Sequence, residues 1–323
     1  RSTLFPYTTL FRSGAFAWVL RKFMNISGSE GLVAAGNIFM GMTESPVLIK
    51  NYLPTMNRSE IFLVMVSGMG TIAGSVMGTY IGMLGGTDPA AKVLFATHLL
   101  SASVMAVPGS IVLAKMLCPQ TEEATDHVAI SGKEKENSNI LDAISSGTVT
   151  GVKLMTNIAA MLLVFISLVA LANYITEGVI GRYTGLNDWI VKITDGKAQG
   201  LTFQFILGVI TSPFMWLIGV PSQDIMLVGS LLGQKTILNE FVAYFQLQQW
   251  KDAGLFMYEK SILMSTYILC GFANISSIGI LLGGLGVLAP EKRGLISRIG
   301  VPAMIGGALV SVLSATIIGM ILG

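Results

Sequence analysis

Charged residues are scarce in this sequence: Asp, Glu, Lys and Arg make up 12% of its 323 residues. Soluble domains carry about 25% charged residues, so this deficit and a mean hydropathy of +0.70 exclude an ordinary soluble protein. Two cysteines and two histidines are too few for a metal cluster, and the cysteines are expected to be packed thiols rather than a disulfide. Because no basic stripe is present, nucleic acid is not an expected partner.

The first segment, residues 1–13, reads RSTLFPYTTLFRS and matches one reading frame of a short-read sequencing adapter. The sequence also begins without a methionine. We expect residues 1–13 to be an assembly artefact, authentic sequence to begin near Gly14, and N-terminal membrane helices to be missing, so the segment is left out of the fold prediction. Resequencing the locus tests this expectation, because a genuine upstream coding sequence through the same codons would exclude it.

Long apolar runs predict membrane-spanning helices, because each can cross the roughly 30 Å of a bilayer core. They lie at residues 61–86, 93–117, 157–181, 261–289 and 300–323. Two further apolar regions are interrupted by glycine, proline and polar residues. Irregular backbone is tolerated at membrane depth only where protein buries it or it lines a cavity, so these regions predict re-entrant helical hairpins. They span 31–56 and 201–233, with turns at Gly41–Pro46 and Gly219–Ser222. The predicted fold is an all-α polytopic membrane protein.

Polar segments divide the chain into parts. A first part, 14–118, holds the first hairpin and the following membrane helices, and 119–156 is a polar loop with an interfacial helix. A scaffold membrane helix at 157–184 leads to the second hairpin and the C-terminal membrane helices at 185–323. The two parts resemble each other, since the run 68–74 aligns with 271–277 and both interrupt an apolar span with small polar residues. Paired broken segments of this kind indicate an inverted repeat with a transport site at the membrane midplane.

Two carboxylates, Glu44 and Glu240, stand isolated in very apolar surroundings, one in each part. A charge at membrane depth costs roughly 3 kcal/mol on insertion scales, so each carboxylate needs a partner or a function. Nearby hydroxyl and amide groups could join them in holding the hydroxyls and ring nitrogens of a polar ligand. The candidate set is Met42, Thr43, Glu44, Glu240, Asn274 and Ser277, with Phe272 as an apolar wall. For the amide and the serine of the second part, a role in linking helices stays open as an alternative.

Neutral oxygens near the first hairpin indicate a possible cation site. Hard cations take oxygen ligands, and transporters build such sites from unwound backbone and helix ends. The oxygens would come from side chains or exposed carbonyls of Asn37, Met40, Thr71, Ile72 and Ser75. Such a set favours sodium, whereas a protonatable glutamate would permit proton coupling, and the hydroxyls could also bond only to their own helix.

The sequence contains none of the motifs expected of an intramembrane hydrolase. His-Glu-x-x-His, Gly-x-Ser-x-Gly and a clustered acid pair do not occur. The segment 229–236 resembles a phosphate-binding loop, but its spacing departs from the Gly-Lys pattern and no strand–helix unit surrounds it. We therefore expect a protein that is not an enzyme.

Five motifs follow one another in the order typical of concentrative nucleoside transporters. They are GNIFMGMTESP from residue 36, TIAGSVMG from 71, GVPSQD from 219, LLGQKTILNEFVAY from 231 and CGFANISSIGILLGGLG from 270. The sequence therefore resembles that family over most of its length, from about Gly14 to Gly323.

The resemblance implies a homotrimer in the cell membrane, in which each protomer moves nucleosides by an elevator-like shift of an inner transport domain. The family's nucleobase contacts match Met42, Thr43 and Glu44, its ribose contacts match Glu240, Asn274 and Ser277, and its pocket-lining positions match Val76 and Phe272. The family's sodium site maps to Asn37, Met40, Thr71, Ile72 and Ser75, partly through carbonyls.

The first hairpin reads Gly-Met-Thr-Glu where many members of that family have Gly-Gln-Thr-Glu. Glutamine hydrogen-bonds a base edge, whereas Met42 offers a soft apolar surface, and this version resembles the purine-leaning members. We predict symport of nucleosides, purines above others, coupled to sodium or protons, with no other cofactor. The alternatives are a nucleoside-binding membrane sensor without net transport and, disfavoured by the missing motifs, an intramembrane enzyme.

Overall fold

The computed structural model describes residues 24, 26–122, 170–194, 196 and 198–323, together with scattered positions between 141 and 168. Every regular element within these ranges is helical, as predicted. The chain divides into two units, one formed by 1–127 and 207–323 and the other by 128–206. The expected artefact at 1–13, most of the expected loop at 119–156 and part of the expected span at 157–181 lie outside the described residues.

The described part of the unit at 128–206 includes the π-helix η2 (Tyr174–Gly181), α7 (Arg182–Thr184) and α8 (Leu186–Ile193). Gly185 has a φ of 73° and separates α7 from α8. The Asn187 side chain joins the two ends of this region, since it donates to the Glu177 carbonyl at 3.0 Å and accepts from the Leu201 amide at 3.0 Å.

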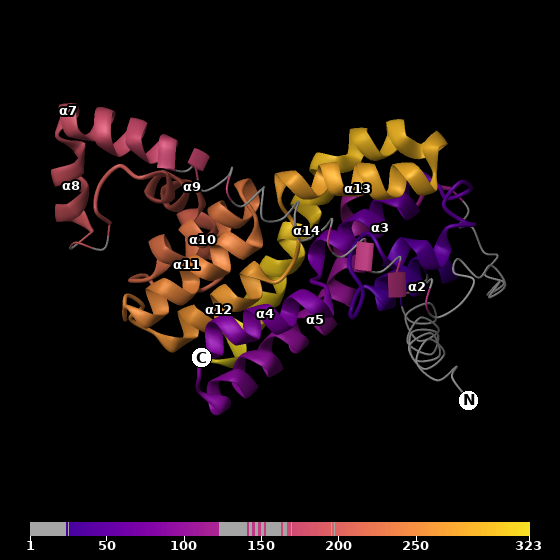
Figure 1. Cartoon of the computed structure of the whole chain (residues 1–323), viewed down its shortest axis with the longest axis horizontal. Coiled ribbons are helices and arrows are strands. Elements are labelled where there is room, and N and C mark those ends of the chain that lie inside the picture. Colours follow the sequence, from indigo (N-terminus) through magenta and orange to yellow (C-terminus); the bar gives the residue numbers. More distant parts are fainter. Residues whose placement is uncertain are drawn as a thin grey trace. The chain divides into compact units, whose positions relative to one another are not determined.

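The unit formed by 1–127 and 207–323 repeats one series of elements, drawn from indigo to magenta and again from orange to yellow (Figure 1). The first series is α2 (Gly28–Gly36), the 3-10 helix η1 (Ser45–Ile49), α3 (Arg58–Gly70), α4 (Gly74–Gly85) and α5 (Pro89–Leu117). The second series is α10 (Ile225–Ile237), α11 (Glu240–Asp252), α12 (Glu259–Leu269), α13 (Ile275–Leu288) and α14 (Arg293–Ile321), preceded by α9 (Phe203–Leu217) and interrupted by η3 (Pro290–Lys292). Both series end in a helix of 29 residues.

Local sequence explains where these helices begin. Capping boxes start α2, through Ser27 and Glu30, and α3, through Asn57 and Glu60. In each box the cap side chain and the acid satisfy one another's backbone amides, which have no partner within the helix. Asp88 caps α5 in a related way, by accepting from the amides of Ala90 and Ala91.

Two of the five predicted membrane spans are broken near their centres. The span at 61–86 becomes α3 and α4, which are separated at residues 71–73, and the span at 261–289 becomes α12 and α13, which are separated at 270–274. The N-cap residues of the helices after the breaks, Ala73 and Asn274, occupy equivalent places. If these caps are paired, Gly74 corresponds to Ile275. The sequence alignment, which pairs Gly68 with Gly271, instead pairs Gly74 with Ser277, two residues further along.

Helices long and apolar enough to cross a membrane occur at 58–85, 89–117 and 290–321 among the described residues. Those at 58–85 and 89–117 coincide with predicted spans, and the one at 290–321 begins before the span predicted at 300–323. Shorter apolar helices at 203–217, 225–237 and 275–288 belong to the broken or interrupted regions.

Chain reversals occur in both regions predicted to form hairpins. In the first, α2 leads into turns at residues 37–44 and then into η1. In the second, the predicted turn between α9 and α10 is present, with Gly219 at a φ of 82°. A further reversal, which we did not predict, joins α10 to α11 through Leu238 and Asn239 alone. Glu240 lies at this further reversal, as the first residue of α11.

The core consists of two apolar clusters, and each cluster contains helices from both series. One contains α2, α3 and buried residues of α13, and the other contains α4, α10, α11 and α12. The two long helices, α5 and α14, contribute to both clusters, and Phe272 packs against both. Each broken helix therefore has one half in each cluster, so a break lies where the clusters meet.

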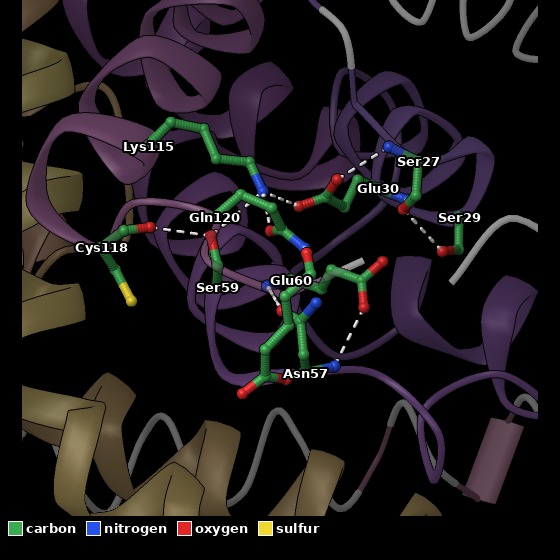
Figure 2. Close-up of polar contacts among 10 residues, drawn as sticks. Ser27, Ser29, Glu30, Asn57, Ser59, Glu60, Lys115, Cys118 and Gln120 are labelled. Atoms are coloured by element: carbon green, nitrogen blue, oxygen red, sulfur yellow. Dashed lines mark hydrogen bonds and ion pairs between the residues drawn. The ribbon is translucent and has the colours of Figure 1, made fainter. Parts of the chain in front are cut away.

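A buried carboxylate lies at the start of two of these reversals, the one that follows α2 and the one between α10 and α11. Glu30, at the start of α2, is fully buried and pairs with Lys115 of α5 at 2.5 Å, while Lys115 also donates to Ser59 of α3 at 3.1 Å (Figure 2). Asp224, before α10, is fully buried and accepts from the amides of Met257 and Tyr258 at 3.0 and 3.1 Å. These contacts fix the bases of the two reversals, whose other ends carry the predicted site residues.

Candidate functional site

The centre of the candidate site is the carboxylate of Glu240, which is 7% exposed. One oxygen accepts from the Tyr80 hydroxyl at 3.3 Å and the other accepts from the Asn274 amide at 2.9 Å. Its two partners come from α4 and from the start of α13, so Glu240 joins segments of both series. A buried charge needs such donors, because an unpaired one is strongly destabilising.

Asn274 is both the partner of Glu240 and the cap of α13. Its Oδ1 accepts from the Ser277 amide at 2.8 Å and from the Ser277 and Ser276 hydroxyls at 3.0 and 2.6 Å. The side-chain oxygen therefore faces its own helix, while the nitrogen faces Glu240. The structure brings together three predicted residues of the second part in this way: Glu240, Asn274 and Ser277.

Aromatic rings form one side of the network. Tyr80 stacks on Tyr244 of α11 with ring centroids 4.1 Å apart, and Phe241 is tilted against Tyr80 at 6.3 Å. The Tyr244 hydroxyl donates to the Thr266 carbonyl of α12 at 2.8 Å. These contacts fix the Tyr80 ring, so its hydroxyl is oriented toward Glu240.

The tip of the first hairpin lies between the two broken helices. Met42 is 7% exposed and packs against Gly68 of α3, where an added methyl group would come within 2.8 Å of the Met42 Cβ. Thr43 packs against Gly284 of α13 in the same manner, at 3.2 Å. The Glu44 side chain is exposed, and its carboxylate accepts from the Gly41 amide at 3.1 Å.

The two predicted wall residues are half-buried. Val76 lies in the first turns of α4 and packs against the cluster that contains Tyr80 and Tyr244. Phe272 lies in the second break and packs against both clusters. Val76 thus lies one helical turn before Tyr80, and Phe272 lies two residues before Asn274.

The predicted cation residues gather around the first break. Asn37 is fully buried, donates to the Ser67 hydroxyl at 3.0 Å and accepts from the Ser45 hydroxyl at 2.5 Å. The Thr71 hydroxyl donates to the Ser67 carbonyl at 2.9 Å, so Asn37 and Thr71 meet at one residue of α3.

The remaining cation residues lie beside this pair. The Gly74 amide donates to the Phe39 carbonyl at 3.2 Å and so brings the sequence neighbours Met40 and Ser75 close together. Met40 is half-buried, Ser75 is exposed and Ile72 is fully buried. The set contains amide, hydroxyl and carbonyl oxygens, the donor chemistry that a hard monovalent cation prefers.

The two breaks touch each other at Gly271. Its φ of 137° is rarely adopted by other residues, and an added methyl group would lie 2.9 Å from the Met69 carbonyl oxygen. Only glycine combines this backbone conformation with so close an approach. The predicted cation residues and the predicted ligand residues are therefore parts of one continuous junction.

Sequence reasoning missed several groups of this junction. Tyr80 lies in a glycine-rich apolar run, where only its hydroxyl at membrane depth marks it as a polar site. Ser67 and Ser45 link the cation residues, and Ser67 could have been found because it lies one helical turn before Thr71.

Comparisons with protein families match nearly the whole chain. A family model described as "Na+ dependent nucleoside transporter C-terminus" matches residues 98–319, and one described as "Nucleoside recognition" matches residues 11–87. Together these matches contain the two breaks and all the candidate residues.

Individual relatives agree with these matches. An uncharacterized transporter of Haemophilus influenzae is 39% identical over 307 residues, which cover 94% of this chain and 68% of that protein. Sodium/nucleoside cotransporter 1 of Rattus norvegicus is 39% identical over 319 residues, which cover 94% of this chain and 46% of that protein. The chain thus spans about two thirds of the bacterial relative and less than half of the rat cotransporter.

Solved structures show the same fold. The structure of CNTnw in an inward-facing substrate-bound state has a TM-score of 0.84 at 35% identity and covers 99% of this chain and 71% of that chain. An outward-facing structure of a CNTnw variant also has a TM-score of 0.84, at 34% identity, and covers 98% of this chain and 71% of that chain.

Proposed function

The chain belongs to the family of concentrative, sodium-dependent nucleoside transporters, and we propose that it performs cation-coupled symport of nucleosides, purine nucleosides above others. Proteins of this family are multi-pass membrane transporters and not enzymes. The observation that carries the proposal is the buried carboxylate of Glu240, held by Tyr80 and Asn274 where the two breaks meet.

The Glu240 network suits the ribose of a nucleoside. A carboxylate has about four acceptor positions, and the two donors on Glu240 leave room for hydroxyl groups of a ligand. Ser277 adds a hydroxyl oxygen that can accept, because its proton is donated to Asn274, and Phe272 offers an apolar face. Neighbouring hydroxyls of a ribose can therefore bond to Glu240 and Ser277 together.

The first hairpin suits the nucleobase. Thr43 and Glu44 at the tip supply hydroxyl and carboxylate groups that can pair with ring nitrogens, and Val76 supplies an apolar wall. Met42 presents a thioether surface where a glutamine would present an amide. Because the larger purine ring gains more from apolar contact and loses less without that amide, we infer a purine preference.

The coupling ion in this proposal is sodium, bound at the first break by Asn37, Met40, Thr71, Ile72 and Ser75. Support comes from the neutral oxygens gathered around Ser67 and from the sodium dependence in the name of the matching family. A cation there favours the hairpin tip closed on α4, so binding of ion and nucleoside would be coupled through the adjoining breaks.

The remaining parts of the proposal follow the resemblance. The protein acts in the cell membrane as a homotrimer, and each protomer carries its substrate by an elevator-like movement of the hairpins and broken helices. The predicted re-entrant placement of the reversals in the bilayer belongs to this proposal. Cross-linking in native membranes tests the assembly, and a limiting product at the mass of three chains is expected.

Uptake by the purified protein in proteoliposomes tests the function. Labelled inosine should accumulate above its external concentration when an inward sodium gradient is imposed, and unlabelled adenosine should compete more strongly than unlabelled uridine. A proton gradient imposed alone distinguishes the two possible coupling ions. Equal competition by uridine would contradict the purine preference but leave symport intact.

A nucleoside sensor without net transport is the second candidate, because the same network would bind ligand in a protein that does not move it. Saturable binding of inosine without accumulation in sealed vesicles would favour the sensor. Recovery of chemically unchanged inosine after uptake is expected, since the family is one of transporters.

A further inference from the structure

Lys235 is a fully buried lysine near the candidate site that the proposed function does not use. It lies in the last turn of α10, with its side chain at 0% exposure. Its Nζ donates to the Ile268 carbonyl at 2.8 Å and to the Ser311 hydroxyl at 3.0 Å. A buried ammonium is costly without such acceptors, so its presence at this depth requires an explanation.

The acceptors of Lys235 belong to the end of a broken helix. Ile268 lies in the last turn of α12, whose final carbonyls lack partners within the helix and carry partial negative charge. The Ser311 hydroxyl in turn donates to the Cys270 carbonyl at 2.7 Å. Lys235 therefore contacts one carbonyl at the second break directly and reaches another through Ser311.

The first break has a comparable contact, made by an uncharged side chain to a serine hydroxyl. There Asn37, at the end of α2, reaches the last turn of α3 by donating to Ser67, and Thr71 bonds to the carbonyl of the same serine. In both series a side chain at the end of the first hairpin arm contacts the last turn of the helix that breaks. The contact is made by a neutral amide in the first series and by an ammonium group in the second.

We infer that Lys235 is a tethered cation. Its ammonium group occupies, at the second break, the position that corresponds to the coupling-ion site at the first break. This inference rests on the proposed function for its first half, the sodium site. It makes Lys235 a positioning residue, because α10 leads directly to Glu240 and the second break leads directly to Asn274. It also implies that one free cation is enough for the protein, since the second helix end already has the ammonium group of Lys235.

Substitutions that separate charge from space test the inference. Lys235→Ala removes the ammonium and leaves a cavity large enough for a small cation, whereas Lys235→Met removes the charge and fills the cavity. Both variants should have a lower midpoint of thermal unfolding than the wild-type protein in detergent. Methylammonium chloride should raise the midpoint of Lys235→Ala by at least about 3 °C over equal choline chloride, and leave Lys235→Met unchanged.

Lys251→Ala is the matched control, because Lys251 also donates to a carbonyl in the last turn of a helix, that of Leu84 in α4, but lies partly exposed. Its midpoint should not respond to methylammonium. If Lys235→Ala is not recovered folded, the folded yield with and without methylammonium is compared instead, and rescue is again expected. The inference would be overturned if methylammonium raised neither the unfolding midpoint nor the folded yield of Lys235→Ala. A Lys235→Met protein as stable as the wild type would also overturn it.

Sodium distinguishes this inference from the proposed function. A wild-type protein that sodium does not stabilise would contradict the sodium site, whereas the methylammonium response of Lys235→Ala would still report on the tethered cation. In nucleoside binding, the Hill coefficient for sodium should rise from about one toward two in Lys235→Ala, because sodium can enter the vacated place. An unchanged coefficient together with wild-type nucleoside affinity would exclude a positioning role.

Discussion

The two helix breaks are alike in architecture and different in chemistry. The first, at 71–73, is surrounded by neutral amide and hydroxyl groups, and the second, at 270–274, is flanked by the buried charges of Lys235 and Glu240. A break surrounded by neutral oxygens can bind a free cation, whereas the second break already has the ammonium group of Lys235 beside it. In the proposed function, the first break would bind the ion and the second would bind the ribose.

The largest expected effect is that of Glu240→Gln, which would remove the charge from the second break. We expect about a hundredfold loss of inosine affinity, because hydrogen bonds to a charged group contribute about 1.5–3 kcal/mol each and 1.4 kcal/mol is tenfold. Equilibrium binding of labelled inosine measures it. Glu259→Gln, an exposed glutamate at the start of α12, is the matched control. A loss below about threefold would end the assignment of the ribose to this break.

Asn37→Ala should affect the first break alone. The sodium concentration for half-maximal inosine binding is expected to rise about tenfold, the lower end of the range for groups that orient a cation's ligands. At saturating sodium the inosine affinity should stay at its wild-type value. Asn51→Ala, in an exposed turn, serves as control. A tenfold loss of inosine affinity that persists at saturating sodium would show that Asn37 stabilises the packing and does not contribute to ion binding.

Tyr80→Phe sharpens the comparison, because it removes one hydrogen bond to Glu240 at the second break without changing the charge there. Loss of the 3.3 Å hydrogen bond to Glu240 should lower inosine affinity about three- to tenfold, in line with about 0.5–1.5 kcal/mol for one hydrogen bond. The sodium dependence should be unchanged. Tyr183→Phe, at an exposed tyrosine, is the control. If the two variants bind inosine equally well, the Tyr80 hydroxyl has no part in the site.

The smallest expected effect is that of Met42→Gln, which changes the kind of nucleoside rather than the strength of binding. The ratio of uridine to inosine potency in competition should shift toward uridine by about tenfold or less, the value of one added hydrogen bond. Total uptake should remain. A ratio identical to that of the wild-type protein would separate Met42 from base selection.

Features set by local sequence were predicted well. The apolar lengths gave most of the long helices, and the small polar residues within two of them marked the breaks. The turn at Gly219 was predictable because glycine and proline favour such turns. Glu240, Asn274 and Ser277 were predicted as ligand groups, and the structure brings them within hydrogen-bond distance.

Features set by tertiary contacts were not predicted. The reversal between α10 and α11 contains only Leu238 and Asn239, without a glycine or proline to mark it. Lys235 was considered within a resemblance to a phosphate-binding loop and within a family motif, but its contacts were not predicted, since its acceptors lie on α12 and α14, distant in sequence. The alignment of 68–74 with 271–277 differs by two residues from the pairing of the helix caps, whose positions only the backbone reveals.

The double role of Asn274 restricts what can replace it. At most helix starts Ser, Thr, Asp and Asn are nearly interchangeable, because each offers an oxygen to the first amides. Here the oxygen faces Ser277 while the nitrogen donates to Glu240, so the position needs an acceptor and a donor on one short side chain. Serine and threonine would not reach both groups, and aspartate would set a second negative charge against the first. For a protein engineer this is a helix cap with a single permitted residue, and the start of α13 and the contact to Glu240 cannot be changed separately there.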